Sequence, residues 1–233
     1  MEADFENAAS DRLRAARRVV IKLGTSIVTG ADGQICAERV QPIVRSIAAL
    51  KSGGRQVVLV SSGAVGLGAG RLNLPRARLN DLVVRQACAA VGQNLLMNAY
   101  ERLFSALDVK IAQVLLTERD FADRSSYQNL RSTIEKLLKL GVLPIVNEND
   151  TVSTAELEYL SDGTGRSFGD NDGLAALLMS KLEAAALILL TDVDGLLSRK
   201  TKKGPSAGAP NERVKAIPLV EKITAELRAA AAC

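Results

Sequence analysis

Short apolar runs recur along this 233-residue chain, and segments with helical periodicity separate them. Uninterrupted apolar runs are typical of strands buried on both faces, as in a parallel sheet that lies between two layers of helices. The expected strands are residues 19–21, 57–60, 110–115, 144–146 and 186–190. The expected helices are residues 40–50, 79–107, 124–140 and 171–182. The pattern predicts an α/β fold, a three-layer αβα sandwich with a central, mostly parallel sheet.

The sequence shows no internal repeat and no linker that would separate independent domains. We expect a polar tail or frayed helix over residues 1–16 and a single domain over residues 17–233. The polar stretch 151–169 is expected to form a hairpin or flap, and residues 200–212 a loop.

Histidine is absent from the composition, and this excludes several kinds of catalytic site. A Ser-His-Asp or Cys-His nucleophile, an HExxH zinc site and a phosphohistidine intermediate all require histidine. Any acid–base or electrostatic chemistry therefore falls to Lys, Arg, Asp and Glu. We expect no resident metal site built from protein ligands.

Charge and cysteine content indicate a cytoplasmic protein that binds small anions. The net charge of +4 is mild, and most basic residues are scattered, so small anionic molecules are favoured over nucleic acid. Cys36, Cys88 and Cys233 have neither paired nor metal-ligand spacing, as expected in a reducing compartment. We expect no membrane span and no signal peptide, because the longest apolar run is too short and the N-terminus is acidic.

Small and polar residues follow four of the expected strands. In open parallel sheets, ligands bind beyond the carboxyl ends of the strands. We therefore expect these four segments to converge on one crevice. They are residues 22–25, 61–64, 147–150 and 191–192.

The common nucleotide-binding motifs are absent or disfavoured. No Gly-Lys dipeptide exists for a Walker A loop, and the His-Arg-Asp motif of protein kinases is impossible without histidine. Gly63, Gly66, Gly68 and Gly70 follow a strand, but their spacing is not GxGxxG, so a dinucleotide site is disfavoured. Glycines at such a turn can still let backbone N–H groups and a helix N-terminus approach an anion.

From residue 19 onward the chain resembles the amino acid kinase family, and within it the glutamate 5-kinases. The combination of Asn-Glu-Asn-Asp at 147–150 with Gly-Asp-Asn-Asp at 169–172 is specific to that branch, whereas the Thr-Asp-x-x-Gly-Leu turn at 191–196 recurs across the family. The segments that carry the resemblance are residues 20–26, 60–65, 90–93, 113–117, 144–150, 169–172 and 189–196.

The resemblance implies a nucleotide site around Lys22. Lys22 would stabilise the transferring phosphoryl group, and Asp172 would orient Lys22. The backbone of Gly24 and Thr25 would cradle phosphate. Thr191 and Asp192 would form the nucleotide-binding turn, although an ordinary β-turn explains that segment equally well.

The resemblance also implies an amino-acid site. Ser62, Gly63 and Ala64 would hold a substrate carboxylate, although a capped helix start is the simpler interpretation. Four further residues would contact glutamate: Asn147, Asp150, Asp170 and Asn171. Asn147 and Asp150 could instead cap a turn, but so many acids in one crevice repel each other unless a cation joins them. The α-ammonium group of the substrate and Mg²⁺ bound to ATP would supply that cation.

The implied activity is transfer of phosphate from ATP to the γ-carboxylate of L-glutamate, the first step of proline biosynthesis. Residues 17–170 would bind glutamate and residues 171–233 the nucleotide. A homo-oligomer (dimer or tetramer), with the helix around residues 87–104 as a subunit contact, and feedback inhibition by proline would follow from the family. Gly92 and Gln93 are expected to serve helix packing.

Two alternatives remain open. One is a related kinase that acts on aspartate, N-acetylglutamate or UMP, which the paired acidic motifs disfavour. The other is a non-catalytic amino-acid or nucleotide sensor on the same fold. The sensor is favoured by the absence of the family's Gly-Gly-Met-x-Thr-Lys loop, whose lysine is the second cation on the phosphate. Because residues 226–233 resemble the helix that follows that loop, we expect the intact protein to contain additional residues there and to exceed 24.7 kDa.

Overall fold

The computed structural model describes residues 10–30, 32–153, 171–193, 195–196, 216–217, 220, 222–225 and 227–228. The chain divides into two units, Met1–Leu190 and Thr191–Cys233. The fold described below is that of the first unit. The expected flap over 151–169 and the loop over 200–212 lie almost entirely outside the described residues. The expected division into glutamate-binding and nucleotide-binding parts stays a prediction.

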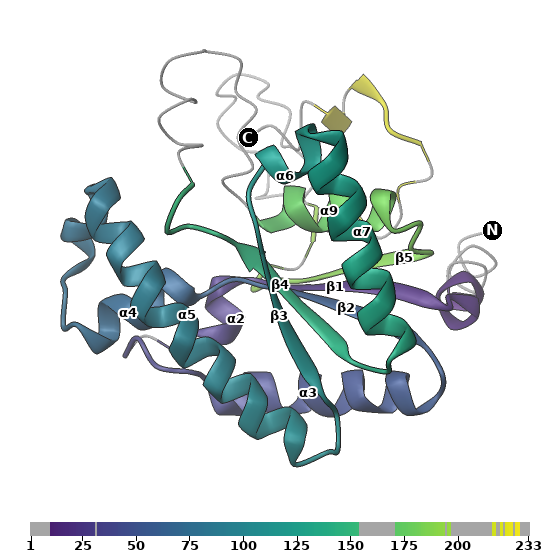
Figure 1. Ribbon diagram of the computed structural model, residues 1–233, viewed down its shortest axis with the longest axis horizontal. Coiled ribbons are helices and arrows are strands. Elements are labelled where there is room, and N and C mark those ends of the chain that lie inside the picture. Colours follow the sequence, from purple (N-terminus) through teal and green to yellow (C-terminus); the bar gives the residue numbers. More distant parts are fainter. Residues whose placement is uncertain are drawn as a thin grey trace, which may run out of the picture. The chain divides into compact units, whose positions relative to one another are not determined.

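Five parallel strands form one sheet in the order β3-β4-β2-β1-β5 (Figure 1). This confirms the α/β fold and each of the five expected strands. The strands are β1 (Arg18–Leu23), β2 (Gln56–Ser61), β3 (Ile111–Leu116), β4 (Leu143–Glu148) and β5 (Ala186–Leu190).

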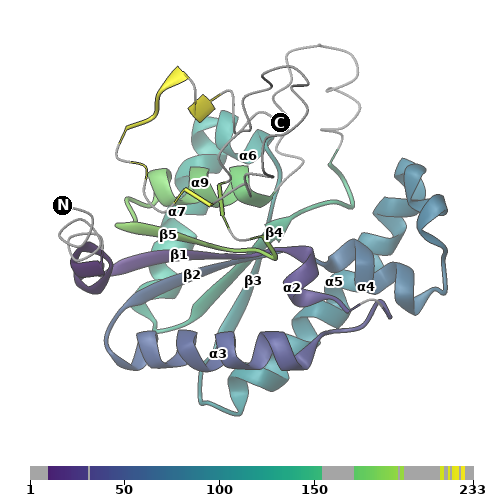
Figure 2. The same ribbon diagram turned by 180° about the vertical axis from the view of Figure 1, so that it is seen from behind.

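Helices cover both faces of the sheet, as Figures 1 and 2 show from opposite sides. One layer contains α3 (Ala37–Ser52), α4 (Ala64–Arg71) and α5 (Leu82–Ser105). The other layer contains α7 (Arg124–Lys139) and α9 (Asn171–Lys181). Three shorter pieces connect them: α2 (Thr25–Val28), α6 (Arg119–Ala122) and the 3₁₀ turn η1 (Arg76–Asn80).

The helix expected over residues 79–107 is interrupted near its start. Residues 76–80 form η1, and α5 begins only after Asp81, whose side chain accepts hydrogen bonds from the backbone N–H groups of Val83 and Val84. An aspartate at this position satisfies N–H groups that have no partner within the helix. The cap therefore fixes where the long helix starts.

The alternation of side chains along β1 divides them between two cores. Val19, Ile21 and Leu23 pack with α3 and α5, whereas Val20 packs with α7 and α9. Successive strand residues point to opposite faces, so Lys22 shares the face of Val20. The side chain of Lys22 is thereby directed toward the layer that contains α9.

The connections that follow β2 and β4 run over opposite faces of the sheet. After β2 it enters α4 and α5, and after β4 it leads to α9 in the other layer. These two strands are neighbours, with Leu59 opposite Ile145 and Val60 opposite Val146. Neighbouring parallel strands whose connections diverge leave a crevice at their carboxyl ends, which is the usual ligand site of such sheets.

Glycines in α4 and α5 allow the two helices to touch. A Cβ atom at Gly68 would lie 1.8 Å from the carbonyl oxygen of Cys88, and one at Gly92 would lie 1.7 Å from that of Ala64. The expected packing role of Gly92 is confirmed. Gly68 belongs to the glycine series that suggested a dinucleotide site, and here it allows α4 to pack closely on α5. Cys36 and Cys88 are free thiols.

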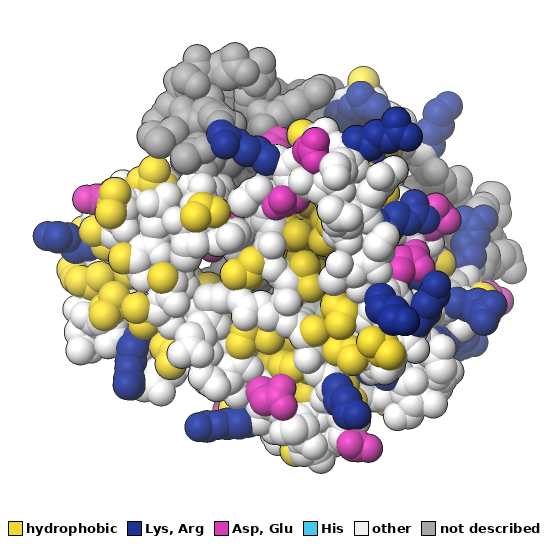
Figure 3. All heavy atoms as spheres, in the orientation of Figure 1, with side chains coloured by type: hydrophobic (Ala, Val, Ile, Leu, Met, Phe, Trp, Pro, Cys, Tyr) yellow, Lys and Arg dark blue, Asp and Glu magenta, His cyan; other side chains and the backbone are white. Residues whose placement is uncertain are grey.

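The edge strand β3 leaves part of its surface uncovered. Its residues are mostly half-buried, in contrast to the fully buried strands β1 and β2. Figure 3 shows hydrophobic side chains gathered in the middle of this face, with Lys and Arg mainly around its edge. No helix in the described part of the chain is long and apolar enough to cross a membrane.

The packing of α4 on α5 leads to a stability prediction. Because no space exists for a methyl group at Gly92, Gly92→Ala should lower the free energy of unfolding by about 3 kcal/mol or more. Urea denaturation measures this change. Gly53→Ala is the matched control, since its Cβ would make only ordinary contacts at 3.5 Å. Equal stability of the two variants would contradict this account of the helix pair.

Candidate active site at the strand ends

An ion pair between a buried lysine and a partly exposed aspartate joins β1 to α9. Lys22 Nζ lies 2.6 Å from Asp172 Oδ1, and the lysine side chain is only 9% exposed. A buried ammonium group is costly unless a carboxylate or another acceptor compensates for its lost hydration. Asp172 lies in the first turn of α9, where the helix dipole also favours a negative charge. The pair holds one positive charge at the end of β1.

A chain of amide hydrogen bonds links α9 to the switch point between β2 and β4. Asn171 Nδ2 donates to Ser62 Oγ at 2.7 Å and to Asn147 Oδ1 at 3.0 Å. Asn147 Nδ2 in turn donates to Gln93 Oε1 at 2.9 Å, and both of these side chains are buried. The network therefore spans both helix layers through the ends of two strands.

The carbonyl oxygen of Asn171 is left without a hydrogen-bond partner. Asn171 Oδ1 is buried, and the residues that the structure describes provide no donor for it. The two N–H groups of the same amide are already used by Ser62 and Asn147. Buried acceptors of this kind are normally satisfied by protein, water or ligand. Asn171 therefore offers an acceptor to a ligand that carries N–H or O–H groups.

The side chains of Ser61 and Ser62 form hydrogen bonds to opposite helix layers, Ser61 to Tyr100 of α5 and Ser62 to Asn171 of α9. Ser61 Oγ donates to the carbonyl oxygen of Ser62 at 3.1 Å, so Tyr100 donates its hydroxyl proton to Ser61 Oγ at 2.8 Å. Burial raises the pKa of Tyr100 well above its ordinary value, and the hydrogen bond to Ser61 opposes this only in part. The phenol therefore stays protonated and remains a donor on the α5 side, while Ser62 faces α9.

A pocket of about 220 Å³ opens beside this network. Gly63, with φ of +110°, turns the chain from β2 into α4, a conformation that favours glycine. Among the described residues, no side chain caps the N-terminus of α4, which leaves its first N–H groups to an anion. The lining residues are Thr25, Ser62, Gly63, Ala64, Val65, Gly66, Arg85, Asn147, Glu148, Asp150 and Asn171.

Most of the predicted amino-acid site comes together in this pocket. Ser62, Gly63, Ala64, Asn147, Asp150 and Asn171 all line it. Lys22 and Asp172, which were expected to lie together, form an ion pair. Asp170 lies outside the described residues, so its placement stays a prediction.

The nucleotide side is only partly described. The N–H of Gly24 donates to the carbonyl oxygen of Leu190 at 3.2 Å, so it is not available to cradle phosphate as expected. Gly24 instead leaves space beside the lysine, since a Cβ there would lie 3.7 Å from Lys22 Nζ. Thr191 and Asp192 belong to the second unit, where Thr191 Oγ1 donates to Asp192 Oδ1 at 3.3 Å. Their role in binding nucleotide stays a prediction.

Sequence analysis missed three contributors to the pocket and its network: Arg85, Gln93 and Glu148. Arg85 and Gln93 lie eight positions apart on α5, which places them on the same helix face as the buried Ala89 and Leu96. Polar residues within an otherwise apolar helical stripe were the available signal. Of these residues, Gln93 was interpreted as helix packing, and Arg85 was not singled out.

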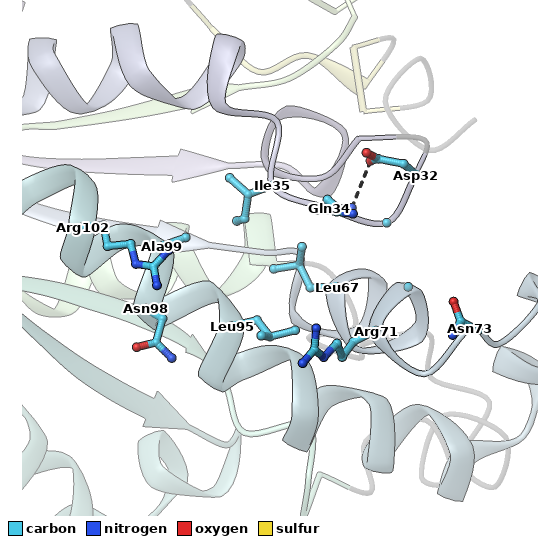
Figure 4. Close-up of a pocket in the computed structure, with 12 residues that line it drawn as sticks. Asp32, Gln34, Ile35, Leu67, Arg71, Asn73, Leu95, Asn98, Ala99 and Arg102 are labelled. Carbon is cyan, nitrogen blue, oxygen red and sulfur yellow. Dashed lines mark hydrogen bonds between the residues drawn. The ribbon is translucent and has the colours of Figure 1, made fainter.

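A second, larger pocket lies away from this site. It has a volume of about 710 Å³ and lies between the segment around Gln34, α4 and α5, with Arg71 and Arg102 among its lining residues (Figure 4). None of the predicted site residues lines it. Within the described ranges, no group of three or more Asp, Glu or Cys side chains could hold a metal ion.

The amide network leads to a prediction about stability. Asn147→Ala would leave the buried Gln93 Oε1 without its donor and would remove one of the acceptors of Asn171 Nδ2, so it should lower the free energy of unfolding by about 2 kcal/mol. Chemical denaturation of Asn98→Ala provides the comparison. Asn98 is exposed and donates a hydrogen bond to Asn94 in its own helix, so its loss should change stability by less than about 0.5 kcal/mol. Equal losses in both variants would show that the network contributes nothing.

Comparisons with known proteins place this geometry in context. Residues 17–226 match the model of the Amino acid kinase family. The Glutamate 5-kinase of Moorella thermoacetica is 46% identical over 219 residues, which cover 94% of this chain and 53% of that protein. The Glutamate 5-kinase of a Synechococcus species is 50% identical over 197 residues, which cover 84% of this chain and 50% of that protein. The chain spans about half the length of these relatives.

Proposed function

This chain belongs to the amino acid kinase family, and on that premise we propose that it phosphorylates the γ-carboxylate of L-glutamate with ATP. The products are γ-glutamyl phosphate and ADP, and the reaction is the first step of proline biosynthesis. The observation that carries the proposal is the start of α9, where Asp172 holds Lys22 and the neighbouring Asn171 lines the pocket. One helix turn thus links a cation suited to phosphate with a pocket suited to an amino acid.

The reaction suits a site without histidine. A γ-carboxylate is ionised at neutral pH, so it can attack the γ-phosphorus of ATP without a general base. The new bond joins a carboxylate oxygen to phosphorus, and the bond from the γ-phosphorus to the bridging oxygen of ADP breaks. Catalysis of such a transfer depends on positioning and on neutralising charge at the phosphoryl oxygens. Lys22 supplies that charge, and Asp172 keeps its ammonium group oriented.

The pocket supplies complementary groups for the amino acid. Asp150 and the unsatisfied Asn171 Oδ1 are acceptors for an α-ammonium group. The uncapped N-terminus of α4 favours a carboxylate. Mg²⁺ enters this scheme bound to the phosphates of ATP, whose charges it neutralises. A homo-oligomer and inhibition by proline are further proposals that rest on the family.

The choice of acceptor is tested by a coupled assay of ADP release. The purified chain is assayed with ATP and Mg²⁺ and with L-glutamate, L-aspartate, N-acetyl-L-glutamate or UMP. We expect ADP release to depend on L-glutamate. The oxygen acceptors of the pocket suit a free ammonium group, which N-acetyl-L-glutamate and UMP lack, and the assay with L-aspartate tests the chain length of the acceptor. Release with another acceptor instead would identify a related kinase. Release that is independent of every acceptor, or no release, would contradict the proposed function.

The role of Lys22 is tested by Lys22→Ala. Loss of its charge from the transferring phosphoryl group should lower kcat with glutamate about 100- to 1,000-fold. A thermal melt checks that the variant remains folded. Lys139→Ala serves as the control, because Lys139 is an exposed residue in the last turn of α7. A folded Lys22→Ala variant that retains the turnover of the control would rule out this role.

A further inference from the structure

Arg85 brings a positive charge to the amino-acid pocket. Among the described residues that line this pocket, it is the one with a cationic side chain. It lies in the first turns of α5, and its backbone N–H donates to the carbonyl oxygen of Asp81 at 3.0 Å. Arg85 shares the pocket lining with two acidic residues, Glu148 and Asp150. The pocket therefore presents both signs of charge, as recognition of a zwitterion requires.

The order of the strands determines which end of the acceptor lies near Arg85. Lys22 is at the end of β1, Ser62 follows β2, and Glu148 ends β4, in the sheet order β4-β2-β1. In the proposed reaction the γ-carboxylate must lie toward Lys22. The α-carbon end of the same molecule then lies toward β4, where Glu148 and Asp150 line the pocket together with Arg85.

The part of α5 that carries Arg85 is anchored on both sides. Asp81 caps the helix just before it. The next residue, Gln86, donates through Nε2 to the carbonyl oxygen of Ser153 at 3.2 Å, and Ser153 Oγ donates to Glu148 Oε1 at 2.6 Å. Two turns later, Gln93 accepts from Asn147. These contacts join the helix start to the segment after β4, so the part of α5 that carries Arg85 is positioned beside the pocket in advance of binding.

From this placement we propose that Arg85 binds the α-carboxylate of the acceptor and makes the pocket selective for a free α-amino acid. The inference rests on the proposed function and deepens it. A guanidinium group can donate two parallel N–H bonds to a carboxylate, which fixes the orientation of the acceptor. Asp150 and Asn171 Oδ1 then receive the ammonium group of the same carbon. The γ-carboxylate is left to face Lys22.

The test compares L-glutamate with its α-carboxamide, L-isoglutamine, which keeps the ammonium group and the γ-carboxylate. In Arg85→Gln, kcat/KM for glutamate should fall about 10- to 100-fold, chiefly through KM, because a charged hydrogen bond to substrate is lost. The KM for ATP should not change. The preference for glutamate over isoglutamine should shrink toward unity, because the variant no longer distinguishes a carboxylate from an amide there.

Controls separate substrate binding from a structural role. Arg71→Gln removes an exposed arginine from the other pocket (Figure 4), so it should leave both substrates unaffected. Arg85→Lys keeps the positive charge but cannot donate two parallel N–H bonds to a carboxylate. It should give a KM for glutamate between those of wild type and Arg85→Gln. If Arg85→Gln fails to fold, the Lys variant alone decides the question by its raised KM and its reduced preference for glutamate over isoglutamine.

The outcomes distinguish this inference from the proposed function. A wild-type chain without glutamate-dependent ADP release contradicts the proposed function, and with it the role of Arg85. Active wild type with a change of less than about threefold in Arg85→Gln overturns the role of Arg85 alone. An unchanged preference for glutamate over isoglutamine overturns it as well, since a purely structural arginine would weaken both acceptors equally.

Discussion

The chain of hydrogen bonds from Gln93 through Asn147 to Asn171 and Ser62 links the two helix layers across the ends of β2 and β4. The neighbouring strands β2 and β4 send the chain to opposite faces, so apolar packing alone leaves their ends unsupported. Amide groups fill this gap because each can donate and accept at once. A fully satisfied buried network is rigid, and a partly satisfied one is costly. The acceptor left over, Asn171 Oδ1, therefore marks where a ligand completes the network.

Function builds on the same helix start. Asp172 reaches Lys22 because both lie on the α9 side of the sheet, a consequence of side-chain alternation along β1. The adjacent Asn171 reaches the pocket. A single helix turn thereby sets the position of the Lys22 ammonium group relative to the pocket. Phosphoryl transfer depends on such positioning more than on acid–base chemistry, and the chain has no histidine to supply the latter.

Prediction from sequence succeeded where local pattern decides the outcome. Apolar runs located the five strands, and the polar residues after them located most of the pocket, because parallel strands end at a common edge. Prediction from sequence failed where the role of a residue depends on a hydrogen-bond partner that is distant in sequence. Gln93 was read as packing, although Asn147 makes it part of the network. The backbone of Gly24 was expected to cradle phosphate with that of Thr25, although the N–H of Gly24 already donates to the carbonyl oxygen of Leu190 in the neighbouring strand.

The amino-acid sequence by itself determined the layers, the absence of histidine chemistry and the kinds of polar group at each strand end. These follow from periodicity and composition, which need no knowledge of neighbours. Tertiary structure alone decided that α9 bridges β1 and the β2–β4 crevice, and that Arg85 faces the same pocket as Asp150. The physical reason is that strand order and crossover side determine which distant residues meet. Periodicity within one segment carries no information about either.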